Sequence, residues 1–187
     1  MCGRYSLFDE QDTEIREIIA KINKKYPAQP VKTGEIFPTD TAPVLILERE
    51  ALTPRPLIWG FPKIQGKGVI INARAETAEE KKIFRDSLLT RRCMIPSTGF
   101  YEWDEQKRKY LFCLPGERTL YMAGIFQEYD GISRYVILTT AANASMKHVH
   151  HRMPVVLPKS KMSMWMTDTA AALHYLHGEM PTLVRTG

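Results

Sequence analysis

The chain has 187 residues, a length that suits one domain with a sizeable core, and residues 1–187 are predicted to form a single domain. Hydrophobic residues make up 44% and charged residues 25%, which excludes a disordered chain, a collagen and a coiled-coil rod. The 26 Lys and Arg against 21 Asp and Glu are a mild excess, compatible with a polyanionic partner without requiring one.

The lack of a recognisable targeting segment and the pattern of cysteines narrow the class of protein further. No run of about 18 apolar residues is present, and residues 1–5 (MCGRY) lack the apolar block of a secretory signal. We therefore expect a cytoplasmic protein with no membrane partner. The three cysteines, Cys2, Cys93 and Cys113, include no CxxC pair, which argues against a disulfide framework and a zinc site. Cys93 and Cys113 are predicted to be buried core thiols.

Four helices are predicted in chain order. Residues 12–25 carry isoleucines at helical spacing, which indicates an amphipathic helix ended by Tyr26-Pro27. The second begins at Thr77 with a capping box to Glu80 and ends near Arg91-Arg92. The third covers residues 160–166, and the fourth covers 169–177 before Gly178.

Strands are predicted from residue 43 onward, where short apolar or alternating runs replace the helical pattern. They cover residues 44–47, 57–59, 69–71, 110–114, 120–126 and 135–140. Because strands outnumber helices and mostly follow one another, we expect an α+β fold with a largely antiparallel sheet. No dinucleotide, P-loop or zinc-protease motif and no repeat is visible.

Cys2 is the first residue with distinctive chemistry. Loss of Met1 would leave Cys2 with an α-amine of pKa about 8 and a thiol of pKa about 8.5 on adjacent carbons. The amine could form a Schiff base with a carbonyl, and the thiol could then close a five-membered thiazolidine. The alternative is that Cys2 has no role at a frayed chain end.

A second polar segment follows at residues 70–77. Asn72, Arg74 and Glu76 alternate with small alanines, so they are predicted to face one way from a strand. An amide, a guanidinium and a carboxylate together suit a phosphate or a sugar. The alternative is a solvated strand end with an internal Arg74–Glu76 pair.

A third segment surrounds Glu102, whose neighbours include Phe100, Tyr101 and Trp103. Aromatic neighbours desolvate a carboxylate and raise its pKa toward the range useful for general acid/base catalysis. The alternative is an edge strand with Glu102 in water.

Residues 147–154 hold three of the five histidines. His148 and His150 would share a strand face, but no third ligand has recognisable spacing, so no metal is expected. A histidine beside Arg152 fits an acid/base group next to an anion site better. His174 and His177 are predicted to lie on the surface of the last helix.

Taken together, these segments resemble the SRAP family, the SOS response-associated peptidase proteins that bond covalently to abasic sites in single-stranded DNA. Five motifs in order carry the resemblance over most of the chain. They are residues 2–5 (CGRY), Trp59-Gly60, residues 72–74 (NAR) with Glu76-Thr77, residues 99–103 (GFYEW) and residues 150–154 (HHRMP).

The resemblance implies a barrel-like, mostly antiparallel sheet with flanking helices and an N-terminus in a basic groove. It implies a nucleoid-associated, monomeric protein without a cofactor, whose partner is single-stranded DNA containing abasic sites. The implied catalytic residues are Cys2 as nucleophile, Asn72 holding the opened sugar, Glu102 assisting ring opening and proton transfer, and His150 as acid/base. Arg4, Arg74 and Arg152 would hold phosphates, and Trp59 and Trp103 would lie near the DNA path.

Three features depart from the family pattern: a short chain, Phe61-Pro62 after Trp59-Gly60, and His151 in place of a smaller polar residue. They concern the fit of DNA more than the chemistry. The chemistry also follows from the residues, because an abasic deoxyribose is partly an open-chain aldehyde, which an N-terminal aminothiol can capture.

Two other functions are compatible with the sequence. One is a cysteine peptidase, above all a self-cleaving one, with Cys2 as nucleophile, His150 as base and Asn72 or Glu102 as the orienting residue. The other is a noncovalent single-stranded DNA-binding module, whose affinity would survive loss of Cys2.

Overall fold

A closed β-barrel forms the centre of the molecule in the computed structural model, which describes residues 2–8, 10 and 12–186. The ring runs through β12 (Ile132–Ala141), β4 (Ala51–Trp59), β3 (Thr41–Glu48), β8 (Arg92–Ser97) and β11 (Leu120–Tyr129), which pairs again with β12. All of these pairings are antiparallel except β4 with β12. The predicted α+β class with a barrel-like, mostly antiparallel sheet is confirmed.

Three short strands extend the barrel sheet. They are β7 (Asn72–Arg74), which runs parallel to β12, β13 (Arg152–Pro154), which also pairs with β12, and β14 (Val156–Leu157), which pairs with β11. Because β7 and β13 both pair with β12, they bring residues 72–74 and 152–154 to the same part of the barrel. A two-stranded ribbon of β5 (Phe61–Pro62) and β6 (Val69–Ile70) precedes β7.

A second, antiparallel sheet stands beside the barrel. Its order is β15 (Val184–Thr186), β10 (Lys109–Cys113), β9 (Gly99–Trp103), β1 (Tyr5–Leu7) and β2 (Gly34–Ile36). The chain passes from β8 into β9 at Gly99, where φ is +151° and a Cβ atom would stand 2.8 Å from the carbonyl oxygen of Phe112. Only glycine fits this turn, which carries the chain from the barrel to the sheet that holds Glu102.

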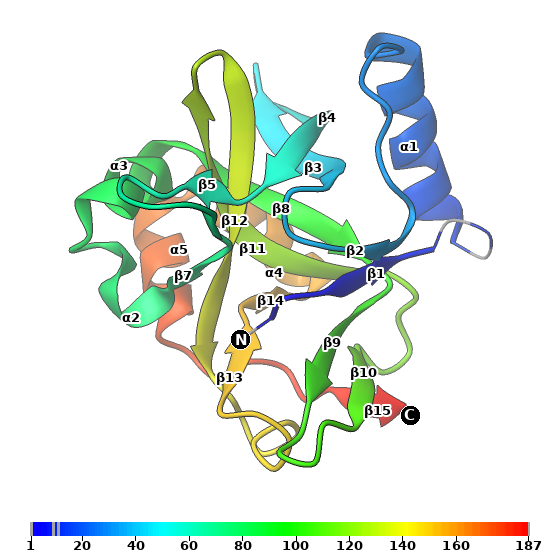
Figure 1. Ribbon diagram of the computed structural model, residues 1–187, viewed down its shortest axis with the longest axis vertical. Helices are drawn as coiled ribbons and strands as arrows, with labels where there is room; N and C mark the ends of the chain where they lie inside the picture. Colours follow the sequence, from blue (N-terminus) through cyan, green and yellow to red (C-terminus); the bar gives the residue numbers. More distant parts are fainter. Residues whose placement is uncertain (1, 9, 11, 187) are drawn as a thin grey trace.

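Five helices flank the sheets within the described residues: α1 (Thr13–Lys25), α2 (Ala75–Ala78), α3 (Lys82–Thr90), α4 (Lys159–Thr167) and α5 (Thr169–Leu176). Figure 1 shows α1 on one side of the barrel and α2, α3 and α5 on the other. No helix in the described part of the chain is long and apolar enough to cross a membrane.

Three of the four predicted helices are confirmed as α1, α4 and α5. Asp12 caps α1 by accepting hydrogen bonds from the backbone N–H groups of Glu14 (3.0 Å) and Ile15 (3.2 Å), as its position before the isoleucine pattern suggests. The predicted single helix from Thr77 to Arg92 is wrong. The chain forms α2 and α3 separately, the residue before α3 is Lys81 without a side-chain cap, and Arg92 already belongs to β8.

The core includes an aromatic group behind the N-terminal strand. Trp59 is fully buried, its ring lies 5.3 Å from that of Tyr5 and 6.3 Å from that of Tyr135, and the two tyrosine hydroxyls are hydrogen-bonded at 2.7 Å. Cys93 is fully buried as predicted, whereas Cys113 is only partly buried.

Candidate functional site

Cys2 lies at the barrel, directly against the segment that carries Asn72. The Asn72 Nδ2 atom donates a 2.8 Å hydrogen bond to the Cys2 carbonyl oxygen, and the Cys2 Sγ atom contacts the Arg4 carbonyl oxygen at 3.8 Å. Cys2 is fully buried. Asn72 begins β7, which the register with Ile137 of β12 fixes in place. Two residues 70 positions apart in the sequence are therefore held together by a direct contact.

The Cys2 thiol is strongly biased toward its protonated form. Burial raises its pKa well above the ordinary value, and the negative charge of Glu102 raises it further. At neutral pH the group is a thiol and not a thiolate, which limits its reactivity until a positive charge arises beside it.

Glu102 lies on β9 opposite Tyr110 of β10, and it is only 4% exposed. The alternative that placed it in water is therefore wrong. Its charge acts on Cys2, where it raises the thiol pKa, and on His150, where it opposes the effect of burial. The second sheet thus delivers a carboxylate to the place where the barrel holds Cys2.

His150 lies in the connection between β12 and β13. Its Nδ1 atom accepts a hydrogen bond from the Arg152 backbone N–H at 3.0 Å, so the neutral ring carries its proton on Nε2. The Arg152 carbonyl oxygen lies 3.2 Å from the same atom and can accept a hydrogen bond from Nδ1 when the ring is protonated there. Burial lowers the His150 pKa, against the opposing charge of Glu102. The ring stacks on His151 with centroids 4.5 Å apart.

The pair His148 and His150 does not lie on a strand, because residues 142–151 form turns and loops between β12 and β13. The shared strand face on which a metal site was considered is thus missing. Among the residues that the structure describes, no three His, Cys, Asp or Glu side chains gather as they would around a metal ion.

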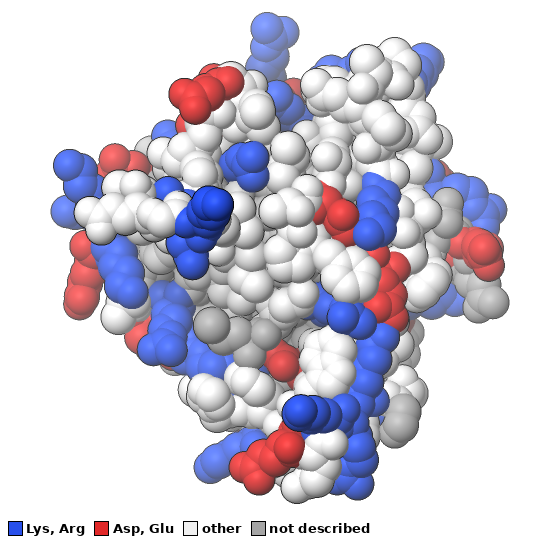
Figure 2. All heavy atoms as spheres, in the orientation of Figure 1, with Lys and Arg blue, Asp and Glu red and all other residues white. Residues whose placement is uncertain are grey.

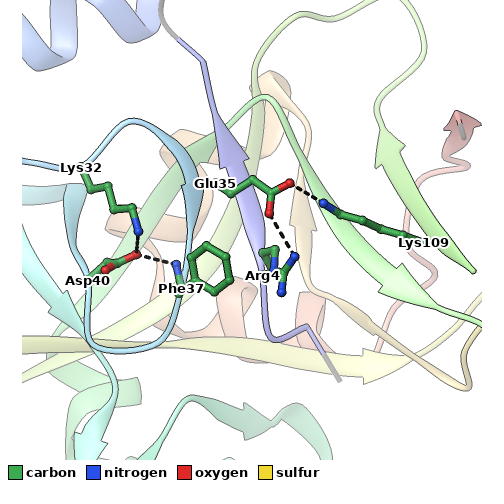
Figure 3. A network of polar contacts seen from close by, with 6 residues as sticks. All are labelled: Arg4, Lys32, Glu35, Phe37, Asp40 and Lys109. Carbon is green, nitrogen blue, oxygen red and sulfur yellow. Dashed lines mark hydrogen bonds and ion pairs between the residues drawn. The ribbon is translucent and has the colours of Figure 1, made fainter. Parts of the chain in front are cut away.

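Arg4 is held between two aromatic rings at the edge of the second sheet. Its guanidinium carbon lies 4.3 Å from the ring centre of Phe37 and 4.9 Å from that of Trp103. Figure 3 shows Glu35 bridging Arg4, at 3.0 Å, and Lys109. Arg4 and Trp103, both predicted site residues, thus form one partly exposed unit.

The turn that carries Phe37 was not predicted as part of the site. Asp40 Oδ2 accepts hydrogen bonds from the Phe37 backbone N–H and from Lys32 Nζ, both at 2.7 Å (Figure 3). Thr39 in this turn has a φ of +76°. An aromatic residue followed by Pro38 and a polar turn was the only local signal, and nothing in it pointed to Arg4.

The guanidinium of Arg152 is bound by other groups of the protein. Arg152 is 8% exposed, its Nη1 and Nη2 atoms bind the two carboxylate oxygens of Glu76 at 2.5 and 2.9 Å, and Nη2 also donates to the Thr139 carbonyl oxygen at 2.6 Å. Glu76 thus occupies the fork with which Arg152 was expected to hold a phosphate, and that phosphate contact stays a prediction. Arg74, in contrast, is exposed on β7.

The predicted alignment of Asn72, Arg74 and Glu76 on one strand face is also wrong. β7 ends at Arg74, and Glu76 lies on α2, where it turns toward Arg152. The hydrogen bonds from Arg152 lower the pKa of Glu76 and keep it ionised.

The ring of Trp59 does not reach the surface of the protein. It is fully buried, and its Nε1 atom donates a 3.0 Å hydrogen bond to the Ile71 carbonyl oxygen. A ring without an accessible face does not favour the predicted place of Trp59 near the DNA path, which stays a prediction. Trp59 supports the residue that precedes Asn72.

Comparisons with known proteins match nearly the whole chain. The model of a family described as SOS response associated peptidase (SRAP) matches residues 1–183. The chain is 32% identical over 196 residues to the abasic site processing protein YoqW of Bacillus subtilis (strain 168), covering 94% of this chain and 84% of that protein. It is 27% identical to the abasic site processing protein YedK of Escherichia coli (strain K12), covering 89% and 79%.

Solved structures share the fold. A protein from Bacteroides thetaiotaomicron aligns with a TM-score of 0.78 at 21% identity, covering 98% of this chain and 90% of that one. A phage-related protein from Bordetella bronchiseptica aligns with a TM-score of 0.75 at 25% identity, covering 99% and 93%.

Proposed function

This chain belongs to the SOS response associated peptidase (SRAP) family, and we propose that it processes abasic sites in single-stranded DNA by bonding covalently to the opened sugar. The observation that carries the proposal is the burial of Cys2 between Asn72, which binds its carbonyl oxygen, and Glu102, whose charge acts on its thiol. All four proposed catalytic residues come from one chain, so a monomer acting at the nucleoid suffices.

The first proposed step is attack of the Cys2 amine on the aldehyde carbon of the abasic deoxyribose. It requires Cys2 to be the first residue of the mature chain; Met1 lies outside the described residues. The amine adds to the carbonyl, a water molecule leaves, and an imine remains. In the proposed step Glu102 takes the proton from the sugar hydroxyl as the ring opens, and His150 donates its Nε2 proton to the departing oxygen.

The second step is closure by the thiol. The sulfur adds to the imine carbon, and its proton passes to the imine nitrogen, which gives a thiazolidine. The raised pKa of the Cys2 thiol supports this order of events, because the thiol is a poor nucleophile alone. A protonated imine beside it would lower its pKa and activate it. Closure also removes the imine that would otherwise promote strand cleavage by β-elimination.

Asn72 has an unused acceptor that suits the opened sugar. Its Oδ1 atom is buried and has no hydrogen-bond partner among the residues that the structure describes, while its Nδ2 atom binds Cys2. A buried acceptor without a partner costs free energy, about 1–3 kcal/mol, which a sugar hydroxyl donating to it would recover. We propose that Asn72 aligns the aldehyde with the Cys2 amine in this way.

The peptidase alternative has less support. A cysteine peptidase needs a thiolate stabilised by a nearby cation, whereas burial and Glu102 raise the pKa of Cys2. The aldehyde reaction begins with the amine and does not need the thiolate.

A denaturing gel tests the function directly. The chain is incubated with single-stranded DNA containing one abasic site, with the same strand lacking the abasic site as control. We expect a heat-stable adduct with the abasic strand only. Binding to both strands without an adduct would favour the noncovalent module, and release of residues ahead of Cys2 without an adduct would favour the self-cleaving peptidase.

A further inference from the structure

Residues 142–151 connect β12 to β13 and carry His150, and hydrogen bonds of their own define their course. The Asn143 carbonyl oxygen accepts from the backbone N–H groups of Met146 at 3.1 Å and Lys147 at 2.9 Å. The Met146 carbonyl oxygen then accepts from the His150 N–H at 3.1 Å, and Met146 is fully buried. Two successive turns therefore lead from Asn143 to His150.

The side-chain amide of Asn143 is bound at both ends. Its Nδ2 atom donates to the carbonyl oxygens of Met180 and Pro181, both at 2.9 Å. Its Oδ1 atom accepts from the Ser145 backbone N–H at 3.1 Å and from the Ser145 hydroxyl at 2.6 Å. The same hydroxyl oxygen accepts the N–H of Leu183 at 3.1 Å. We call these residues the Asn143 clamp.

The chain that the clamp binds leads directly into the second sheet. It continues from Leu183 into β15, which pairs with β10, and β10 is the hairpin partner of β9, where Tyr110 stands opposite Glu102. In Figure 1 the red chain from α5 to β15 passes beside the connection that precedes β13. The clamp therefore ties the connection that carries His150 to the sheet that carries Glu102.

The segment on the far side of the clamp depends on these side chains for its backbone partners. Residues 180–183 have no regular structure, yet Met180 and Leu183 are only 4% and 5% exposed. Buried backbone groups outside helices and sheets need such partners. Loss of the Asn143 amide would take the donor from two carbonyl oxygens at once. We expect the segment and the connection to separate.

The Asn143 amide has no capacity left for a ligand. An asparagine amide offers two N–H donors and one oxygen that accepts two hydrogen bonds. Both donors are bound to carbonyl oxygens, and the oxygen accepts two hydrogen bonds from Ser145. Asn143 can therefore serve the site through the chain that it holds, and not through a contact with DNA.

We propose that Asn143 is a positioning residue for the abasic-site reaction and that it acts through the clamp to hold His150 in register with Glu102. The inference rests on the proposed function, in which His150 and Glu102 move protons for one opened sugar. Proton transfer requires donor and acceptor within hydrogen-bond reach, so the position of the His150 backbone controls the rate.

Adduct rate and strand affinity, measured separately, test the proposal. Asn143→Ala should slow adduct formation at saturating DNA by about ten-fold or more, because a misplacement of about 1 Å can cost about 10²-fold. Its affinity for an intact single strand should keep the natural value. No charge is lost, and the Lys and Arg side chains that Figure 2 shows over the region of β9, β10 and β15 remain.

Ser145 and Asn23 supply graded and control variants. Ser145→Ala keeps both Nδ2 hydrogen bonds of Asn143 but loses the link to Leu183, so it should slow the adduct less than Asn143→Ala. Ser145→Thr keeps the hydroxyl and should react at the natural rate. Asn23→Ala changes an exposed asparagine of α1 and is the matched control.

Asp168→Ala separates positioning from a general loss of stability. Asp168 caps α5 by accepting the Ala171 N–H at 2.9 Å, outside the clamp, so its loss should lower the unfolding temperature without slowing the adduct. Hydrogen exchange adds a readout that does not need the reaction. The backbone amides of Met146 and His150 should exchange faster in Asn143→Ala and at the natural rate in Asp168→Ala.

Two kinetic outcomes would overturn the proposal. One is an adduct rate in Asn143→Ala that is natural or falls only as far as in Asp168→Ala at equal stability. The other is a loss of intact-strand affinity as large as the loss of rate, which would place Asn143 in the DNA interface. If the natural chain forms no adduct, the proposed function fails. Exchange at His150 then decides on the clamp alone, and an unchanged rate of exchange in Asn143→Ala overturns it.

Discussion

The sulfur and the amine of Cys2 have separable roles in the proposed reaction. Cys2→Ala keeps the backbone amine, so the variant should still form the imine, but it cannot close the ring. We expect an adduct that borohydride traps and that does not survive heating without it. The abasic strand should also be cut more often than with the natural chain, because the imine stays open to β-elimination.

Time courses on denaturing gels provide the measurement, and the intact mass of each protein establishes that its chain begins at position 2. Cys113→Ala is the control, because Cys113 is a second free thiol, partly buried, that the proposed reaction does not use, and its loss should leave the adduct unchanged. A heat-stable adduct from Cys2→Ala at the natural yield would falsify the thiazolidine step.

Glu102 couples Cys2 to His150 through its charge, and the sign of each effect can be worked out. A carboxylate opposes formation of a thiolate and favours an imidazolium, so it raises the pKa of both neighbours. Glu102→Gln should therefore lower the pKa of the Cys2 thiol and lower that of His150 still further below its ordinary value of about 6.5. Adduct formation should slow by about 10²-fold, the usual loss of an acid/base group.

Thiol alkylation against pH follows Cys2, and NMR titration of the imidazole follows His150. Glu105→Gln removes an exposed carboxylate of the same hairpin and is the control for a general change in charge. If Glu102→Gln and Glu105→Gln shift the two groups equally, Glu102 has no special place between them.

At the scale of elements, one ion pair ties the two segments that supply Asn72 and His150. Glu76 on α2 follows the strand of Asn72, and Arg152 on β13 donates its backbone N–H to His150. The Arg152 side chain is 10% exposed and that of Glu76 is 44% exposed, so solvent screens part of the interaction. Glu76→Gln should lower the free energy of unfolding by about 1 kcal/mol, as for one charged hydrogen-bonded pair.

The same variant should slow adduct formation, because α2 and β13 lose a link, while affinity for an intact strand keeps its dependence on salt. Urea denaturation and binding at several salt concentrations measure the two effects. Arg74→Ala is the contrasting variant. Loss of its exposed cation should flatten the slope of log affinity against log salt by about 0.7, the contribution of one phosphate contact on a single strand. A flatter slope in Glu76→Gln would mean that this ion pair also positions a phosphate contact.

Regular elements were predictable where the pattern is long. The isoleucine spacing of α1 and the apolar runs of β3, β4, β11 and β12 mark these elements without help from their neighbours. β1, β13 and β15 have three residues each, too few to show a period. The Thr77 capping box was misleading because burial of Ala75 and Ala78 against the barrel, and not capping, fixes the start of α2.

At the scale of the whole molecule, the site depends on contacts that no local pattern contains. Cys2 meets Asn72 across 70 positions, and Arg4 meets Glu35 across 31. Motif order and residue chemistry were enough to select Cys2, Asn72, Glu102 and His150 as candidates. They could not tell that Arg152 is paired inside the protein or that Trp59 is buried, because both facts depend on how β7, β12 and β13 pair.

Trp59 connects the barrel core to the site. Variants of Trp59 distinguish a structural role behind Asn72 from a direct contact with DNA. Its indole N–H binds the carbonyl oxygen of Ile71, the residue before Asn72, and its ring packs against Tyr5 and Tyr135. Trp59→Phe leaves a gap and removes one of the two hydrogen bonds to the Ile71 carbonyl oxygen, which keeps the one from the Ile137 backbone N–H, so the free energy of unfolding should fall by about 1–2 kcal/mol. Adduct formation should slow because the Asn72 segment loses one of its contacts with the core.

Trp103→Ala should behave in the opposite way, because Trp103 is partly exposed beside Arg4. Its loss should weaken binding of intact single strands by about ten-fold, the contribution of one stacked base, and change stability little. Thermal unfolding and fluorescence anisotropy on both variants decide between these roles. Trp59→Phe could instead weaken strand binding and keep the unfolding temperature of the natural chain. In that case Trp59 contacts DNA in solution, and the closed core around it must open for the strand to bind.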